Sequence, residues 1–497
     1  MSEFKIQRQT EAEKDDYLFE CFHDAGFINS ITTSNYSILC GRKGTGKTAI
    51  ARYLEQKSQD YGIKLSYRIS IRSVSLTEGE SFNDHLNSIL FFIIIKTIQK
   101  FLEEKLFIGS SESYWLDFLT QNGLQDTSDY ETFIETRRVN KTGFSVKGWL
   151  NSLFAKAEGG ANTEDESQST RSVISNAPSS LINSLKETTP KEDTIFIFID
   201  DISDYLDEAD EKKLKEDLVT IRELLLSLDL YNSIFRDSGK KLRFICLIRD
   251  DLFEFMQGSN INKLINDSLK LEWNEKSFAS LLIRRIPYYQ DRLQESLSDP
   301  IKALRSQFPD TIFSKTLENF ETNRYATNFY AYMIAISFNR PRDFLKFCYA
   351  MRDRLSTKHP ATFENIDSAE IEYSEYFTKE LKDELFLISR LLKYNFSQDN
   401  INELIDLLSG KEGFNVSQLK TELGQYLGVK TKLGWNRIQE FIQELWWYGV
   451  IGFKEKNDKV IHFKYISSNY PLLVKKFKEY SFFLHRGLYW FAQKRKK

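Results

Sequence analysis

The sequence predicts an α/β fold built on a parallel β-sheet. Thr194–Ile199 is an unbroken run of β-prone apolar residues, as in a central strand that helices cover on both faces. Three further β-prone runs lie at Tyr36–Cys40, Leu65–Val74 and Leu242–Ile248. Segments with helical periodicity separate all four runs, and strands that alternate with helices in this way form a parallel sheet.

The connecting helices follow from apolar residues at helical spacing. One begins near Lys47, after the first strand and a glycine-rich turn, and longer ones are expected at Ser81–Phe107 and Glu211–Leu230. Residues 108–191 interrupt the alternation as an insertion. Within it, Glu158–Ser180 is rich in Gly, Ser and acidic residues, so we expect a mobile loop there.

The chain beyond the sheet is expected to be mainly helical. No convincing strand is found from Trp273 to about Tyr376. Further on, the helical patterns Val416–Leu427 and Trp435–Tyr448 precede two short β-like runs, Val450–Phe453 and Val460–Ile466. Helices followed by such a hairpin predict a winged helix.

The composition excludes a disordered chain, because 41% of the residues are hydrophobic and 14% are aromatic. The formal net charge of -3 gives no whole-chain attraction for nucleic acid or anionic lipid. The charge is uneven, however, since Val450–Lys497 holds 12 Lys or Arg and 3 Asp or Glu. Any contact with a polyanion is therefore expected at the C-terminus.

The cysteines and apolar runs indicate a cytoplasmic protein without membrane contact. The four cysteines are far apart and form no CxxC pattern, which argues against a zinc knuckle or a dense disulfide framework. The longest apolar run, Ile89–Ile95, is shorter than the roughly 20 residues needed to cross a bilayer. Met1–Lys14 lacks the apolar centre of a signal peptide.

The strongest motif is GRKGTGKT at Gly41–Thr48, which satisfies G-x-x-x-x-G-K-[ST] between a strand and a helix. Glycines let such a loop turn its N–H groups toward a phosphate, and the positive end of the following helix favours the same anion. Lys47 can reach the β and γ phosphates, and the Thr48 hydroxyl can ligate Mg²⁺. The alternative is a glycine turn without a ligand. The predicted nucleotide-binding residues are Gly41, Arg42, Lys43, Gly44, Thr45, Gly46, Lys47, Thr48 and Ala49.

Two carboxylates, Asp200 and Asp201, follow the apolar run Thr194–Ile199. The carboxyl edge of a parallel sheet is where such sheets bind ligands. We expect Asp200 to hold Mg²⁺ and Asp201 to polarise the attacking water, a task more often given to Glu, so that slow hydrolysis is expected. The alternative is that the pair caps the next helix.

The base of the nucleotide is predicted by elimination. GTPases of this architecture read guanine with an NKxD loop. The Asn-Lys pairs at Asn140 and Asn262 continue without the required Asp. ATP is therefore favoured over GTP.

Taken together, these motifs resemble the AAA+ and STAND branch of P-loop ATPases, in particular prokaryotic initiator-like or defence-associated members with a C-terminal winged helix. The resemblance also uses the strand ending Leu-Ile-Arg-Asp-Asp at 247–251, Leu271-Glu-Trp273 and Asn339-Arg-Pro-Arg342. It implies a P-loop ATPase core at residues 1–272, a helical lid at 273–378 and a winged-helix-like domain with a basic tail at 379–497.

The resemblance also assigns roles to arginines. Arg249 matches the sensor-one position near the γ phosphate; the alternative is a local ion pair with Asp250. Arg342 matches the sensor-two arginine of the lid, although Asn339 replaces the family's usual Gly; the alternative is a surface arginine. Arg284 and Arg285 are candidate trans arginine fingers, or a solvated charge pair.

The basic C-terminus suggests a contact with DNA. Lys454, Lys456, Lys459 and Lys464 fall on the expected wing, where they would neutralise phosphates. The preceding helix carries Glu440 and Glu444 and is a poor surface for reading bases. The alternatives are a docking surface and a solvated tail.

The leading hypothesis is an ATP-dependent molecular switch that uses Mg²⁺ and hydrolyses slowly. By resemblance, its setting is prokaryotic antiviral defence or a DNA-linked process, with a separately encoded effector protein and a candidate homo-oligomer. Two alternatives remain, a nucleotide-binding assembly module with little turnover and a winged-helix DNA-binding regulator.

Overall fold

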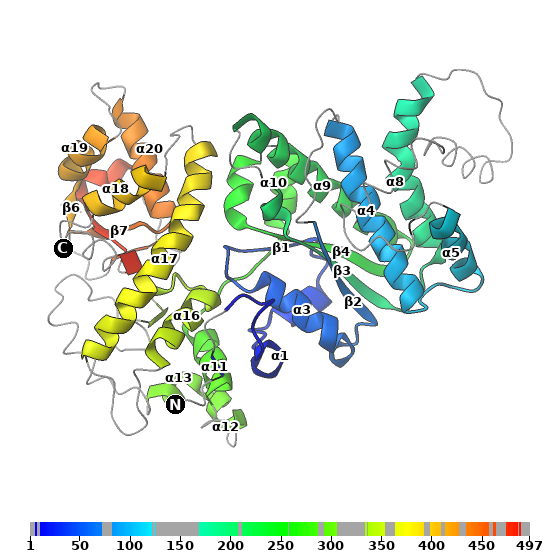
Figure 1. Cartoon of the computed structure of the whole chain (residues 1–497), viewed down its shortest axis with the longest axis horizontal. Helices are drawn as coiled ribbons and strands as arrows, with labels where there is room; N and C mark the ends of the chain where they lie inside the picture. Colours follow the sequence, from blue (N-terminus) through cyan, green and yellow to red (C-terminus); the bar gives the residue numbers. More distant parts are fainter. Residues whose placement is uncertain are drawn as a thin grey trace. The chain divides into compact units, whose positions relative to one another are not determined.

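The computed structural model describes most of the chain and divides it into two compact units, one of residues 26–42 and 47–271 and the other of residues 1–25, 43–46 and 272–497 (Figure 1). We refer to them as the sheet unit and the helical unit. The described residues are 5–6, 10–71, 82–121, 124, 168–206, 211–256, 258–286, 293–305, 333–334, 336–352, 363–391, 398–408, 413–426, 434–456, 461–463, 474–485 and 487–488.

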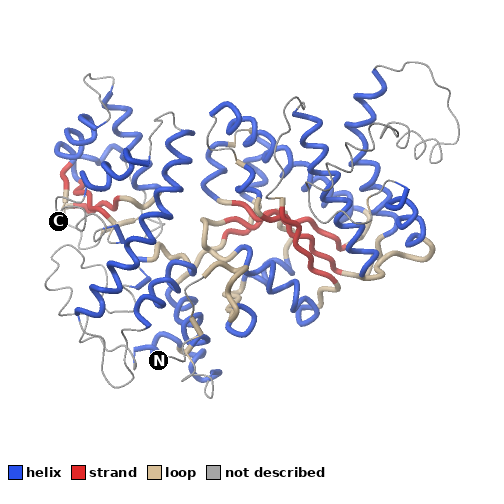
Figure 2. The backbone as a smooth tube through the Cα atoms, in the orientation of Figure 1, coloured by secondary structure: helices blue, strands red, loops and turns tan. Residues whose placement is uncertain are grey.

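The sheet unit contains a five-stranded sheet in the order β2-β3-β4-β1-β5 (Figure 2). All neighbouring strands run parallel, which confirms the α/β class and the parallel sheet. β3 is buried from Ile195 to Ile199, as its composition predicts. The short edge strand β5 was not predicted, because two residues carry no periodicity. The strands are β1 (Ile38–Cys40), β2 (Leu65–Ser70), β3 (Thr194–Asp200), β4 (Lys241–Ile248) and β5 (Leu269–Lys270).

Helices cover both faces of this sheet, with α3 on one face and α4 and α9 on the other (Figure 1). This covering explains why the central strands are apolar along their whole length. The helices of the unit are α2 (Phe27–Thr33), α3 (Lys47–Lys57), α4 (Phe82–Glu103), α5 (Ser111–Gln121), α8 (Gln168–Thr188), α9 (Glu211–Asp237) and α10 (Ser259–Asn266), with 3₁₀ turns η1 (Ser58–Tyr61), η2 (Ile202–Tyr205) and η3 (Asp250–Phe255).

The expected mobile loop at Glu158–Ser180 is wrong for its second half. Residues 168–180 belong to α8, which packs against α4; residues 158–167 lie outside the described part. Leu181, Ile182 and Leu185 are buried. Their helical spacing places them on one side of α8, where they hold the helix in the core. The Ser-rich composition gives this segment a low helix propensity. The helix forms because it packs against the rest of the unit.

α4 is the most apolar helix of the described chain. Its stretch His85–Glu103 is the one described segment long and apolar enough to cross a membrane. Of this stretch, 61% is buried inside the protein. Ile93, Ile98 and Phe101 are fully buried. This burial is typical of a helix in a hydrophobic core.

The helical unit surrounds one hydrophobic core that extends from Phe278 to Leu488. Its three-stranded antiparallel sheet has the order β6-β8-β7. The predicted boundary between residues 378 and 379 lies within the long helix α17. The elements are α1 (Leu18–Cys21), α11 (Glu275–Arg285), α12 (Leu293–Ser298), α13 (Pro300–Arg305), α16 (Pro341–Arg352), α17 (Phe363–Leu391), α18 (Gln398–Leu408), β6 (Phe414–Asn415), α19 (Val416–Tyr426), α20 (Gly434–Trp447), β7 (Ile451–Glu455), η5 (Val474–Glu479) and β8 (Tyr480–Leu484).

The predicted hairpin after α20 is only partly correct. β7 occupies the place of the first run, and Phe453 and His462 exchange two backbone hydrogen bonds of 3.0 and 2.7 Å. Most of the second run, Val460 and 464–466, lies outside the described residues. The longer partner of β7 is β8, which the sequence analysis did not identify because basic residues interrupt the apolar pattern of that region.

All four cysteines are buried and free, namely Cys21, Cys40, Cys246 and Cys348. Free cysteines in such places act as small hydrophobic side chains.

A buried ion pair ties the N-terminal segment to α11. The Arg285 guanidinium donates to the Asp15 carboxylate at 2.5 and 3.3 Å and to the Lys5 carbonyl at 3.0 Å. We expect Asp15→Asn to destabilise the protein by about 3 kcal/mol, because it leaves a buried guanidinium without its counter-charge. Urea denaturation measures this loss. Asp16→Asn is the matched control, since Asp16 is exposed; equal midpoints for the two variants would contradict the expectation.

Candidate nucleotide site

The loop Gly41–Gly46 leaves the carboxyl end of β1, and α3 begins at Lys47. Gly44 and Gly46 have φ of 86° and 99°, in the left-handed region that favours glycine. Gly41 is not among the residues with positive φ; its N–H donates to the Ile248 carbonyl at 3.3 Å and extends the pairing of β1. Two of the three predicted glycines therefore bend the loop, and the first continues the strand.

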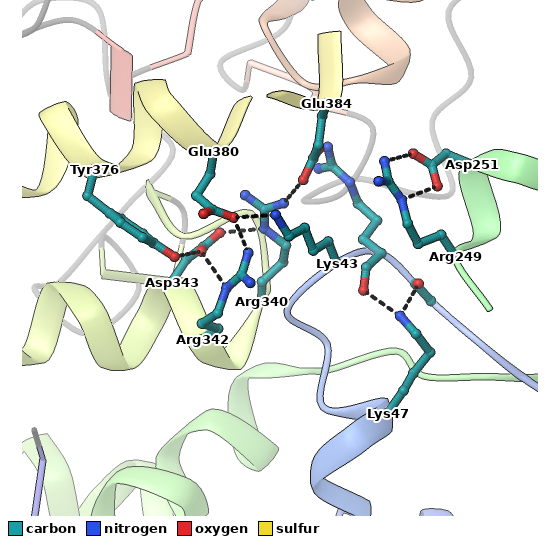
Figure 3. A network of polar contacts seen from close by, with 12 residues as sticks. Lys43, Lys47, Arg249, Asp251, Arg340, Arg342, Asp343, Tyr376, Glu380 and Glu384 are labelled. Carbon is teal, nitrogen blue, oxygen red and sulfur yellow. Dashed lines mark hydrogen bonds and ion pairs between the residues drawn. The ribbon is translucent and has the colours of Figure 1, made fainter. Parts of the chain in front are cut away.

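The Lys47 side chain folds back onto this loop (Figure 3). Its Nζ donates to the Gly41 carbonyl at 2.6 Å and to the Arg42 carbonyl at 3.0 Å. Burial lowers the pKa of Lys47 to about 8, and the negative charge of Asp250 opposes that shift. The amine is thus held against the backbone carbonyls at the start of the loop. This position suits an anionic ligand.

The two predicted metal ligands contact each other. Asp200, at the end of β3, is buried, and the Thr48 side chain in the first turn of α3 lies beside its carboxylate. The Asp201 N–H donates to Asp200 Oδ1 at 2.8 Å, and Arg68 Nη1 donates to Oδ2 at 3.2 Å. Burial and the neighbouring charge of Asp201 raise the pKa of Asp200.

Asp201 has an unusual backbone conformation and is held through its side chain. Its φ of 60° is left-handed, which Asp and Asn tolerate better than other non-glycine residues. Ser70 Oγ donates to Asp201 Oδ2 at 2.5 Å, and Arg68 Nη1 lies 4.0 Å from the same oxygen. Asp201 makes no side-chain capping bond to η2, so the capping alternative is wrong.

Arg68 and Ser70 are site residues that the sequence analysis missed. Both lie on β2, where Ser70 pairs in register with Asp200. The alternating polar positions of this strand were visible in the sequence, but the pairing of β2 with β3 was not, and only that pairing places them beside the two carboxylates.

Arg249 forms a local ion pair, as one alternative expected, but with Asp251 rather than Asp250. Its Nε and Nη2 donate to the two carboxylate oxygens of Asp251 at 3.0 and 2.5 Å (Figure 3). Asp250 instead lies 4.0 Å from Lys270, and burial raises its pKa.

Arg342, in the first turn of α16, is not a surface residue. Its side chain is only 12% exposed, and its Nη2 donates to Glu380 Oε2. Its backbone N–H donates to the Gly44 carbonyl at 3.3 Å. A Cβ on Gly44 would lie 3.1 Å from Arg342 Nε, so close packing against Arg342 adds to the need for glycine here.

A network of buried charges surrounds Arg342 (Figure 3). The fully buried Arg340 pairs with Asp343 and with Glu384, and Tyr376 OH donates to Asp343 Oδ1 at 3.1 Å. Asn339 has φ of 54°. Asn accepts this left-handed conformation, which explains how it replaces the Gly expected in this motif.

Trp273 supports the loop from the helical unit. Its Nε1 donates to the Thr45 carbonyl at 2.9 Å, and its ring packs edge-on against His23 at 6.1 Å. Arg285, one of the two candidate arginine fingers, is buried in its pair with Asp15 and does not form a solvated face. Arg284 is partly exposed.

His23 provides a pH test of this packing. Burial and the positive charge of Arg284 lower its pKa from 6.5 to about 4. Below about pH 6.5 the unfolded chain therefore binds a proton that the folded chain does not, so we expect stability to fall from about pH 6.5 toward pH 4. Urea midpoints at pH 7 and pH 5 should differ less in His23→Gln than in the wild type. Parallel losses in the two proteins would contradict the expectation.

The residues at the carboxyl edge suit one hard divalent cation. Thr48 and Asp200 supply a hydroxyl and a carboxylate, and Mg²⁺ in phosphate sites is typically bound by one or two protein oxygens plus the phosphates. Among the described residues, no group of three or more His, Cys, Asp or Glu could hold a metal by itself. The donor set fits Mg²⁺ better than a zinc-type site.

Comparison with known families matches residues 291–382 to the FunZ-associated C-terminal helical domain. This segment contains Arg342 and Glu380. A comparison with curated proteins finds no match.

Proposed function

We propose that this protein binds ATP with Mg²⁺ and hydrolyses it slowly as a molecular switch of the AAA+ and STAND type, with a P-loop core. The closeness of Thr48 to Asp200, together with the left-handed glycines of the loop, carries the proposal. The last residue of GRKGTGKT lies beside the carboxylate that ends β3, which supports a phosphate loop and a metal-binding carboxylate in one site.

Each residue of this site has a role in the proposal. The N–H groups of residues 41–48 bind the phosphates, and Lys47 Nζ exchanges its two carbonyl acceptors for phosphate oxygens. Thr48 and Asp200 hold Mg²⁺, which when bound supplies positive charge to the β and γ phosphates. Asp201 orients the attacking water and accepts its proton at a carboxylate oxygen.

Arg342 links α16 to the loop residues 43–46 within the helical unit in this proposal. Because its backbone N–H binds the Gly44 carbonyl, a shift of the loop moves α16. Such a switch has two positions of α16. A γ phosphate can favour one position over the other only if its contact with Arg342 differs between them. Arg249 would contact the γ phosphate only after its ion pair with Asp251 breaks.

A defence-related setting is supported by the match to the FunZ-associated domain. We propose a cytoplasmic protein that works with a separately encoded effector and forms a homo-oligomer when ATP is bound. Contact with DNA through Lys454, Lys456 and the rest of the basic C-terminus stays a secondary proposal.

One observation favours the second candidate, an assembly module with little turnover. Asp201 is held by Ser70 at 2.5 Å, so its carboxylate must leave that hydroxyl to reach a water. Steady-state phosphate release with Mg·ATP, with and without DNA, separates the candidates. Sustained release supports the switch, whereas ATP binding without release supports the module.

A further inference from the structure

Glu380, near the middle of α17, contacts two cations from different segments. Its Oε2 accepts a hydrogen bond from Arg342 Nη2 and lies 3.3 Å from Lys43 Nζ (Figure 3). Its side chain is 18% exposed. Burial opposes its ionisation, but the charges of Arg342 and Lys43 hold the pKa of Glu380 below its ordinary value. A single carboxylate oxygen thus connects the phosphate loop to α16.

The surrounding carboxylates pair mainly with Arg340. Glu384, one turn further along α17, pairs with Arg340, and Asp343 pairs with the same arginine. These pairs are almost fully buried, and Asp343 also lies 3.9 Å from Arg342 Nε. Glu380 differs from them in that its ion pairs include Lys43, a residue of the motif GRKGTGKT.

We propose that Glu380 is a positioning residue that competes with the phosphates of ATP for Lys43 and Arg342. Carboxylates and phosphates accept the same charge-assisted hydrogen bonds from lysine and arginine. Binding of a phosphate at either cation therefore weakens the hold of Glu380. Release of Glu380 from Arg342 then couples occupancy of the loop to the position of α17 within the helical unit. This inference rests on the proposed binding of ATP.

The competition predicts discrimination between ATP and ADP. Arg342 is expected to meet the γ phosphate, so ATP gains more than ADP when Glu380 is neutralised. Glu380→Gln keeps the size of the side chain and removes its charge. We expect this variant to bind ATP roughly threefold to tenfold more tightly, with a smaller change for ADP, as is typical for the loss of one partly buried ion pair.

The test measures the Kd of ATP and of ADP in magnesium buffer by isothermal titration calorimetry, together with thermal stability. Glu372→Gln is the matched control, because it makes the same change at an exposed position of the same helix. A raised ADP-to-ATP ratio of Kd values in Glu380→Gln, but not in Glu372→Gln, supports the inference.

Two other results overturn it, and they are distinguishable. If the wild type binds ATP and Glu380→Gln leaves the ADP-to-ATP ratio of Kd values unchanged, or changes it as much as Glu372→Gln does, only this inference fails. A lower thermal stability of Glu380→Gln then assigns Glu380 a structural role. If the wild type binds no ATP, the proposed function fails with it.

Discussion

Lys47→Ala is expected to lose ATP binding. The substitution removes two or more charged hydrogen bonds to phosphate oxygens, each of about 1.5–3 kcal/mol, so the affinity should fall roughly 100-fold or more. The same amine also binds the carbonyls of Gly41 and Arg42, and its loss loosens the loop that supplies the backbone N–H groups. Titration of a fluorescent ATP analogue measures the change.

Lys57→Ala is the control for this experiment, because Lys57 is an exposed residue in the last turn of the same helix. It removes one positive charge and leaves the loop intact. If Lys47→Ala bound ATP as well as Lys57→Ala does, Gly41–Thr48 would be a structural turn and not a phosphate loop.

Asp201→Asn is expected to bind ATP and to lose turnover. The amide cannot accept a proton from water, so the rate of phosphate release should fall by about 100-fold or more, while binding is preserved. Asn is preferable to Ala here, because the φ of 60° at Asp201 strains alanine by about 1 kcal/mol or more. Single-turnover and steady-state phosphate assays measure the effect.

Asp193→Asn provides the comparison, since Asp193 precedes β3 at the opposite edge of the sheet. It should retain full turnover. Equal rates in Asp201→Asn and the wild type would remove Asp201 from the chemistry. A loss of ATP binding in Asp201→Asn would indicate a role in holding the site together instead.

Much of the sheet could be predicted because its signals are local. The apolar run of β3, the glycine-rich loop after β1 and the carboxylates after Ile199 are each contained in a few consecutive residues. The order of the strands was not predicted, because it depends on pairings between distant segments. The contact between Thr48 and Asp200 is the direct consequence of this arrangement.

The rest of the site depends on pairings between distant segments. Arg68 reaches Asp200 because β2 pairs with β3, and Glu380 reaches Lys43 through tertiary packing. Neither position has a motif of its own. α8 was mistaken for a loop for a related reason, since packing against α4 overrides the preference of its Ser-rich sequence.

Calorimetric titration of ATP into the purified full-length protein, with and without Mg²⁺, tests the central claim most directly. We expect saturable binding of one nucleotide per chain that strengthens when Mg²⁺ is present, because Thr48 and Asp200 then hold the ion against the phosphates. An absence of saturable heat in magnesium buffer, at protein and ATP concentrations of about 1 mM where even weak sites would register, would contradict the account.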